Sequence, residues 1–272
     1  MTETPTQRRS GFAAFAHALG AHLDMDSSAW SESDLLVEQL GWDSMVAVEV
    51  VSWLEEQGIR LPDDLLAEIR TLGDVYHYSQ TLAPAPGEPA QPGSRAPLRG
   101  RRVHLAPLTG AHHGEALDLF TRGDNLVRFR LRGTTPSPET FGRVLWDRVL
   151  CQFAVLHSNR MVAMVSAFEP DMRNRHVHVA VVSRPDAPQG AGLEGLVLLI
   201  DHLFAEFDLR KVYAEVLEPN STTFSSGLGR VAQVEGRLVD HEFMSGRYHD
   251  MLVIGITRER WQEHAARLLG PL

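Results

Sequence analysis

The chain has 272 residues, a formal net charge of −9, 43% hydrophobic residues and a single cysteine. This length allows two domains, and one cysteine excludes an internal disulfide and a metal site built from several thiolates. No basic patch interleaved with aromatic residues stands out, and the most apolar segment, 193–204, is too short to span a bilayer, so we expect neither nucleic-acid binding nor membrane insertion.

The first residues do not resemble a secretion signal. The sequence MTETPTQRRSGFAAFAHALG has a basic pair followed by small apolar residues, but His17 interrupts that run and no clear cleavage site follows. We therefore expect a cytoplasmic protein.

Residues 1–82 predict a domain made only of helices. After Ser44 the apolar residues recur at helical spacing, and Pro62 is typical of the first turn of a helix. Four helices in so short a segment form a small bundle. They are expected from about 10 to 23, from Ser44 past residue 54, from Pro62 to about 70, and from Thr71 or Asp74 to about 82.

Residues 83–98, APAPGEPAQPGSRAPL, form a boundary. Five of these sixteen residues are proline and most others are small, so the segment is typical of a semi-rigid linker. Its reach is up to about 50 Å at ~3.1 Å per residue. Residues 1–82 hold 14 Asp and Glu against 4 Lys and Arg, whereas residues 83–272 hold 21 against 22. This difference in charge predicts two modules with different partners.

Residues 99–272 alternate between strand and helix patterns. They predict an α/β (α+β) domain around a mixed, mostly antiparallel sheet. The sequences HSNRM and MSGRY are typical of tight hairpin turns. Helices are expected at 111–122, 138–149, 193–207, 221–228 and 258–269, and strands at 102–106, 151–157, 160–168, 175–183, 210–217, 232–243 and 247–256.

Ser44 has two interpretations. A serine that opens a helix is a good N-cap, because its oxygen accepts a hydrogen bond from a free backbone N–H. The stretch LGWDSMVAVEVVSWLEEQGIRLPDDLLAEIRTLGDVYHY, however, resembles an acyl carrier protein, with Asp43-Ser44-Met45 in place of the Asp-Ser-Leu attachment motif. The resemblance implies that Ser44 carries a 4′-phosphopantetheine arm, which a separate phosphopantetheinyl transferase adds. The acidic residues of the same helix are then expected to dock basic partner enzymes.

The second domain contains a glycine loop between a strand and an apolar helix, RHVHVAVVSRPDAPQGAGLEGLVLLIDHLF. Further on come LRKVYAEVLEPN and GLGRVAQVEGRLVDHEFMSGRYHDMLVIGITRERW. In this order the segments resemble the GNAT acyltransferases, in the branch that acetylates the N-termini of ribosomal proteins. The resemblance implies that Gly190 and Gly192 bring backbone N–H groups close to a phosphate of the cofactor. In the register that keeps Glu194 aligned, Ala187 stands where the family has Gln or Arg near the pyrophosphate, and Gln189 fills this position only in a shifted register. An alanine there favours a carrier-bound donor over free coenzyme A or acyl-coenzyme A.

The resemblance also carries over to individual polar residues. Asn220 matches the asparagine that contacts the pantetheine arm. Thr223, with Ser225 as a substitute, matches an acid that protonates the departing thiolate. Glu242 matches a glutamate that acts as general base, which this chemistry needs because a free amine is mostly protonated near neutral pH.

Each of these residues also has an ordinary structural interpretation. Asn220 and Thr223 are natural helix caps, and Glu242 could be a solvated hairpin residue. Asp240, two residues before Glu242, is expected on the same strand face. Cys151 lies in an apolar strand pattern, and we expect it to be packed and inert.

Other candidate groups surround the glycine loop. Backbone N–H groups near Val181–Ser183, Val182 among them, are expected to stabilise the oxyanion. His176 and His178 share one side of a strand, where they either line a substrate channel or form a half-buried sheet face. No zinc-site spacing involves them, and we expect no metal. Asp250 is expected to brace the hairpin of 232–256 rather than to react.

Together the resemblances imply an N-acyltransferase with a carrier domain (1–82), a linker (83–98) and a GNAT domain (99–272). It would move an acyl chain from the phosphopantetheine thioester of its own carrier domain to an amine. The domain order resembles the carrier–GNAT fusion of goadvionin-type lipopeptide biosynthesis, which favours a peptide N-terminus as acceptor and a polyketide or fatty-acid synthase as acyl source.

Two alternatives stay open at this stage. One is a loading didomain that transfers acyl from acyl-coenzyme A onto the carrier, with or without decarboxylation. The other is a non-enzymatic carrier with a degenerate GNAT-like docking module.

Overall fold

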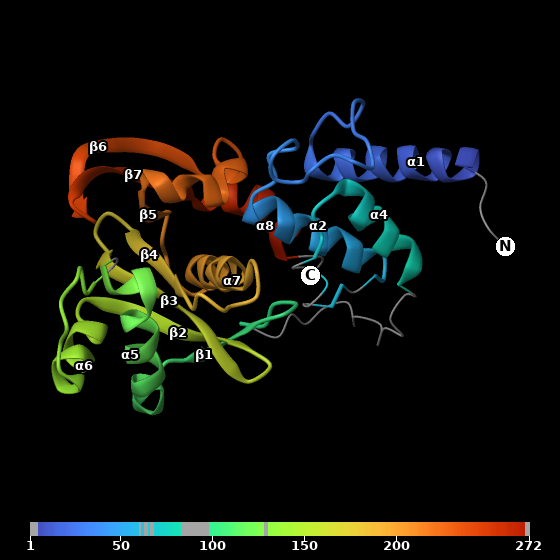
Figure 1. The fold of residues 1–272 in the computed structure, drawn as a ribbon. Coiled ribbons are helices and arrows are strands. Elements are labelled where there is room, and N and C mark those ends of the chain that lie inside the picture. The colour runs from blue at the N-terminus through green and yellow to red at the C-terminus, as the bar shows by residue number, and fades with distance from the viewer. Residues whose placement is uncertain are drawn as a thin grey trace.

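The computed structural model describes residues 5–59, 61–62, 65, 68–82, 98–127 and 130–269. An N-terminal helical domain is followed by a domain in which helices cover both faces of a seven-stranded sheet (Figure 1). No helix within these ranges is long and apolar enough to cross a membrane.

The helical domain contains α1 (Pro5–Leu23), α2 (Ser44–Glu56) and α4 (Leu72–Thr81). Their apolar faces meet in one core, where Leu19, Leu54 and Leu72 are fully buried. The helix α1 begins several residues before its predicted start. The helix predicted after Pro62 lies largely outside the described residues.

Side-chain caps define where α2 and α4 begin. At α2 the carboxylate of Asp43 accepts hydrogen bonds from the N–H groups of Met45 (2.9 Å) and Val46 (3.1 Å). At α4 a capping box joins Thr71 and Asp74, so both predicted start residues take part in one motif. Each cap satisfies N–H groups that a helix leaves free at its N-terminus.

The sheet of the second domain has the strand order β1-β2-β3-β4-β5-β7-β6. All neighbouring strands are antiparallel except β4 and β5, which confirms the predicted mixed, mostly antiparallel sheet. The hairpin turns of HSNRM and MSGRY are also confirmed, with positive φ at both central residues of each turn. The strands are β1 (His104–Pro107), β2 (Val149–His157), β3 (Arg160–Asp171), β4 (His176–Ser183), β5 (Lys211–Leu217), β6 (Gln233–Met244) and β7 (Arg247–Thr257).

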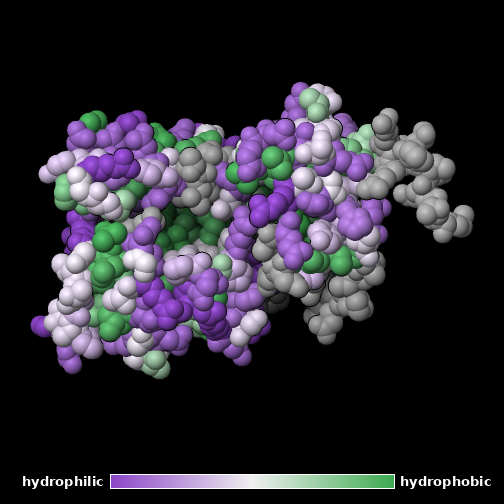
Figure 2. All heavy atoms as spheres, in the orientation of Figure 1, coloured by the Kyte–Doolittle hydropathy of each residue, from purple (hydrophilic) through white to green (hydrophobic). Residues whose placement is uncertain are grey.

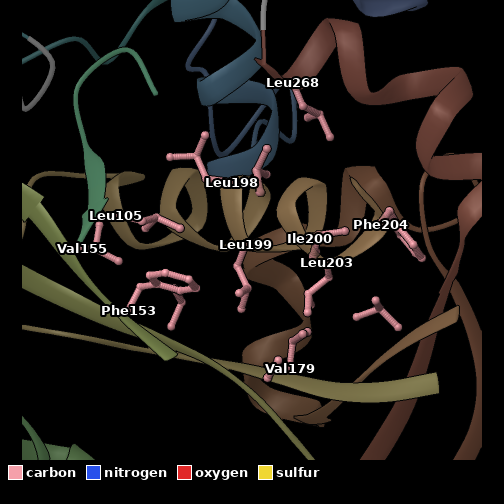
Figure 3. Packing of buried hydrophobic residues seen from close by; sticks show 14 of the residues in the cluster. Leu105, Phe153, Val155, Val179, Leu198, Leu199, Ile200, Leu203, Phe204 and Leu268 are labelled. Atoms are coloured by element: carbon pink, nitrogen blue, oxygen red, sulfur yellow. The ribbon is translucent and has the colours of Figure 1, made fainter. Parts of the chain in front are cut away.

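Helices pack on both faces of this sheet. The helix α7 (Ala191–Glu206) lies on one face, where Leu199 and Leu203 point toward Phe153 and Val179 of the strands (Figure 3). The opposite face carries α5 and α6 over a second apolar cluster. The remaining elements are the 3-10 segments η1 (Gly110–His112), η2 (Gly123–Val127) and η3 (Glu218–Gly227), and the helices α5 (His113–Thr121), α6 (Pro138–Trp146) and α8 (Arg258–Leu269).

Two predicted helices differ from the structure. The one expected at 138–149 ends at Trp146, because β2 already begins at Val149. The one expected at 221–228 is the 3-10 segment η3, which contains Pro219 and a run of Ser and Thr. Such residues are poor helix formers, because their side chains compete for backbone hydrogen bonds or lack a donor.

The buried carboxylate of Glu194 in α7 fixes the start of the second domain. It accepts hydrogen bonds from the backbone N–H groups of Arg101 (2.7 Å) and Arg102 (2.9 Å) and pairs with the Arg102 guanidinium at 3.2 Å. This one side chain therefore attaches the chain that leaves the linker to the central helix.

The pairing between β4 and β5 ends early. Only His176–His178 of β4 pair with Lys211–Tyr213 of β5. Beyond these residues β4 still pairs with β3 as far as Ser183, and β5 still pairs with β7 as far as Leu217. The two strands therefore part, and the edges that face each other leave a gap at their carboxyl ends.

Close packing of α7 on the sheet yields a first prediction. A Cβ on Gly195 would lie 2.6 Å from Cγ2 of Val155, which is closer than side-chain carbons approach. We expect Gly195→Ala to lower the free energy of unfolding by about 1–3 kcal/mol, since overpacking outweighs the gain in helix propensity. Chemical denaturation followed by circular dichroism measures this change.

Gly114 in α5 is the matched control, because a Cβ there meets no atom within 4 Å. Gly114→Ala should be neutral or slightly stabilising. If the two alanine variants have the same free energy of unfolding, α7 does not approach β2 as closely as described.

Candidate active site

Ser44 is the first residue of α2 and is only partly buried. The interpretation of Ser44 as the N-cap is wrong, because Asp43 takes that role with its own side chain. The serine hydroxyl is therefore not used to cap the helix. A phosphate attached to this oxygen would lie at the positive end of the helix dipole, so the position fits a phosphopantetheine arm.

The first turns of α2 lie against the second domain. A Cβ on Gly227, at the end of η3, would collide with the sulfur of Met45. A Cβ on Gly190, in the loop before α7, would lie 3.4 Å from Cγ2 of Val48. Ser44 therefore belongs to a turn that bridges η3 and the glycine loop.

The glycine loop fits closely between α7 and β4. Gly190 is the N-cap of α7 with a φ of 78°, a backbone conformation that favours glycine, and it has no side chain to cap the helix. A Cβ on Gly192 would collide with the hydroxyl of Ser183, so Gly192 serves the packing of α7 on β4. Ala187 packs against the apolar core, and the Arg102 guanidinium donates to the carbonyl oxygen of Gln189 at 3.0 Å.

Val182 lies on the part of β4 that has separated from β5. Its side chain is buried in the cluster under α5 and α6, so only its backbone can face the gap. The next residue toward the paired region, Val181, is 37% exposed. Figure 2 shows a hollow with hydrophobic walls between the β6–β7 part of the molecule and the strands below it. The backbone near Val181–Ser183 therefore lies where β4 has separated from β5, and its role in stabilising the oxyanion stays a prediction.

Glu242 bridges two elements at the rim of this gap. Its carboxylate is 16% exposed and pairs with Arg132 at 3.3 Å. Asn125 anchors the loop of Arg132 to the carboxyl end of β4, because its amide donates to the carbonyl oxygen of Ser183 at 3.0 Å. Glu242 itself pairs with His249 beyond the end of β5.

The expected shared face of Asp240 and Glu242 is wrong. A register shift between Leu238 and Glu242 bulges the strand, and Asp240 has a φ of 48°. The alternation of side chains is lost across such a bulge. The bracing role of Asp250 agrees with the structure, since its carboxylate accepts from the N–H of Asp240 (2.8 Å) and from the Arg237 guanidinium.

The remaining predicted residues lie in η3 or nearby. Asn220 is partly buried in η3. Thr223 and Ser225 belong to the same segment, but their side chains are outside the described part of the chain. Burial raises the pKa of the Cys151 thiol to about 11, which suits a packed and unreactive side chain.

His176 and His178 form part of a half-buried sheet face. Their rings contact Tyr213, and His178 and Tyr213 line an open hollow of about 350 Å³ together with Glu235. The Lys211 ammonium lies over the Tyr213 ring and 2.7 Å from Glu235. The half-buried sheet face therefore agrees with the structure, and the substrate channel stays a prediction. Within the described ranges no three His, Cys, Asp or Glu side chains lie together as a metal site.

Sequence reasoning missed the residues that hold α2 on the second domain. Arg101 and Arg230 pair with Glu55 and Glu49 of that helix. The basic run RGRR at 99–102, directly after the linker, was a signal for Arg101. No local pattern pointed to Arg230.

Solved structures resemble the second domain. The spermidine N-acetyltransferase of Vibrio cholerae, in complex with CoA and spermine, superposes with a TM-score of 0.52 at 20% identity, covering 59% of this chain and 98% of that one. A dodecameric form of the same enzyme gives a TM-score of 0.50 at 18% identity, covering 59% and 96%. The second domain thus has the GNAT fold.

The first domain matches by sequence. The family model described as a phosphopantetheine attachment site covers residues 13–79. An acyl carrier protein of Sinorhizobium fredii is 38% identical over 58 residues, which is 21% of this chain and 74% of that protein. An acyl carrier protein from Wolinella succinogenes is 40% identical over 60 residues, which is 22% of this chain and 79% of that protein. Through this N-terminal domain the chain belongs to the acyl carrier protein family.

Proposed function

We propose that this protein transfers an acyl chain from its own carrier domain to an amine. The proposal rests on one observation, the packing of the helix that carries Ser44 against the glycine loop and η3 of the GNAT-fold domain. A carrier serine at the open gap between β4 and β5 suits delivery of a tethered donor into that gap.

The phosphopantetheine arm of Ser44 supplies a thiol that holds the acyl group as a thioester. Glu242 takes a proton from the ammonium form of the acceptor, and the neutral amine then forms the C–N bond as the C–S bond breaks. The backbone edge near Val182 donates to the carbonyl oxygen, where negative charge develops. Thr223 or Ser225 returns a proton to the sulfur, and Asn220 holds the arm.

An amine acceptor is supported by the fold, which this domain shares with an enzyme that acetylates spermidine. Among amines we propose the N-terminus of a peptide in lipopeptide biosynthesis. The acyl chain would come from a polyketide or fatty-acid synthase, and a phosphopantetheinyl transferase would add the arm. The reverse transfer, from acyl-coenzyme A to the carrier, and a purely non-enzymatic role are the alternatives that the experiments below separate.

The first prediction here concerns Ser44. Incubation with coenzyme A and a broad-specificity phosphopantetheinyl transferase should add one arm to the chain, and Ser44→Ala should accept none. Intact-protein mass spectrometry measures the addition. An arm on the alanine variant would show that another residue is the attachment site.

The second prediction concerns the donor. Free acyl-coenzyme A should have a much lower kcat/KM than the acylated carrier domain. Ala187 offers no polar side chain to the pyrophosphate, and α2 lies against Gly190 in the same loop. Equal kcat/KM values for the two donors would favour the loading role instead.

The third prediction concerns Glu242. Its replacement by Gln keeps the size of the side chain but removes the proton acceptor. Acyl transfer in a single turnover should slow by about 10²- to 10⁴-fold, or about 3–5 kcal/mol of barrier. The loss should shrink as the pH rises, since more of the acceptor amine is then already neutral.

Asp240→Asn is the control for charge. The residue is exposed, lies in the bulge, and has a positive φ that asparagine tolerates. The Asp240→Asn variant should transfer the acyl group at nearly the rate of the unmodified chain. A rate for Glu242→Gln within threefold of the unmodified chain would mean that another group accepts the proton.

A further inference from the structure

The helix α2 has a second buried face that the helical bundle does not use. Met45 belongs to the apolar core of the second domain rather than to that of the bundle. Val48 adjoins Leu198 of α7 and Leu268 of α8, which lie beside α2 (Figure 3). Val51 lines the same space, although it also packs in the core of the bundle. This face is therefore an interface between the carrier and the GNAT-fold domain.

Charges across this interface are complementary. The Arg230 guanidinium reaches both carboxylate oxygens of Glu49 at 2.9 Å, and Glu49 is 1% exposed. The Arg101 guanidinium pairs with Glu55 at 3.2 Å. The hydroxyl of Ser52 donates to the carbonyl oxygen of Arg267 at 3.2 Å.

The burial of Glu49 gives this contact its specificity. A carboxylate removed from water is costly unless a cation with good geometry compensates it. The Nη2 nitrogen of Arg230 donates to both carboxylate oxygens of Glu49, and hydrogen bonds between ionised groups are roughly twice as strong as neutral ones. Glu49 and Glu55, six residues apart on α2, thus match arginines from two distant parts of the second domain's sequence.

The interface also restricts which other molecules can bind at the glycine loop. Val48 of α2 and the guanidinium of Arg102 both lie against Gly190. A nucleotide bound at this loop and the docked helix would need the same space. The docked carrier therefore stands where a soluble donor would place its nucleotide.

We propose that this docked arrangement is the transfer state within one chain, and that α2 must leave the surface of Arg101 and Arg230 before Ser44 can be loaded. The inference rests on the proposed function for its transfer step. Met45, Val48 and Glu49 lie within five residues of Ser44 and are buried in the interface. A partner enzyme therefore cannot bind these turns of α2 while the carrier is docked. The linker sequence, with its reach of up to about 50 Å, permits release.

Arg230→Glu tests the proposal from the side of the second domain, because it leaves α2 itself unchanged. It replaces an attraction to the buried Glu49 by a repulsion. We expect single-turnover acyl transfer to slow at least tenfold and loading of Ser44 by a phosphopantetheinyl transferase to become several-fold faster. Arg173→Glu, an exposed site with the same charge change, should alter neither rate.

Two further measurements keep the test independent of folding. The double variant Glu49→Arg with Arg230→Glu restores opposite charges and should recover most of the transfer rate, which a misfolded domain would not. Dilution of the loaded chain should leave the first-order transfer rate unchanged, because donor and acceptor site lie in one molecule.

The outcomes are distinct. A loading rate that Arg230→Glu does not change would overturn the docking, whatever happens to transfer. A transfer rate that rises in proportion to chain concentration would overturn transfer within one chain. Faster loading in a protein that acylates no amine would support the docking and overturn the proposed function instead.

Discussion

The separation of β4 from β5 is the constraint on which the rest of the structure depends. Three residue pairs hold the strands together, and beyond His178 and Tyr213 each strand keeps only its outer partner. The free backbone edges, the glycine loop at the end of β4 and η3 at the end of β5 all follow from this divergence. Every residue proposed for the reaction lies on one of these elements or at the rim they form.

Helix α2 joins this gap to the carrier domain. One face closes the helical bundle through Val46, Val50 and Leu54, and the other meets the second domain through Met45 and Val48. The helix α2 therefore has hydrophobic residues on two faces, rather than one hydrophobic face opposite an acidic face in water. Glu49, an acidic residue of this helix, is 1% exposed and among the most buried charges of the described residues.

Local signals explain most of what could be predicted. The strands alternate between two faces and the hairpin turns have residues that suit positive φ, so all seven strands lie close to their expected ranges. The start of α4 follows from a capping box that Thr71 and Asp74 form within four consecutive residues. The glycine loop and the attachment serine were predicted because family resemblance ties them to a known order of elements.

What could not be predicted depends on contacts between distant parts of the chain. Glu49 and Arg230 are 181 residues apart, and no periodic pattern connects them. The bulge at 239–241 shifted Asp240 away from the face of Glu242, although simple alternation placed them together. Glu194 accepts from the backbone N–H groups of Arg101 and Arg102, which are 93 and 92 residues away, and no local pattern indicates this contact.

The central claim is that the acyl chain leaves Ser44 for an amine on a separate molecule. The most direct measurement follows both species by mass after the loaded chain is mixed with a peptide that has a free N-terminus, without coenzyme A. We expect the protein to lose the acyl mass and the peptide to gain the same mass as an amide. An acyl group that stays on Ser44, or that leaves only as the free acid, would contradict it.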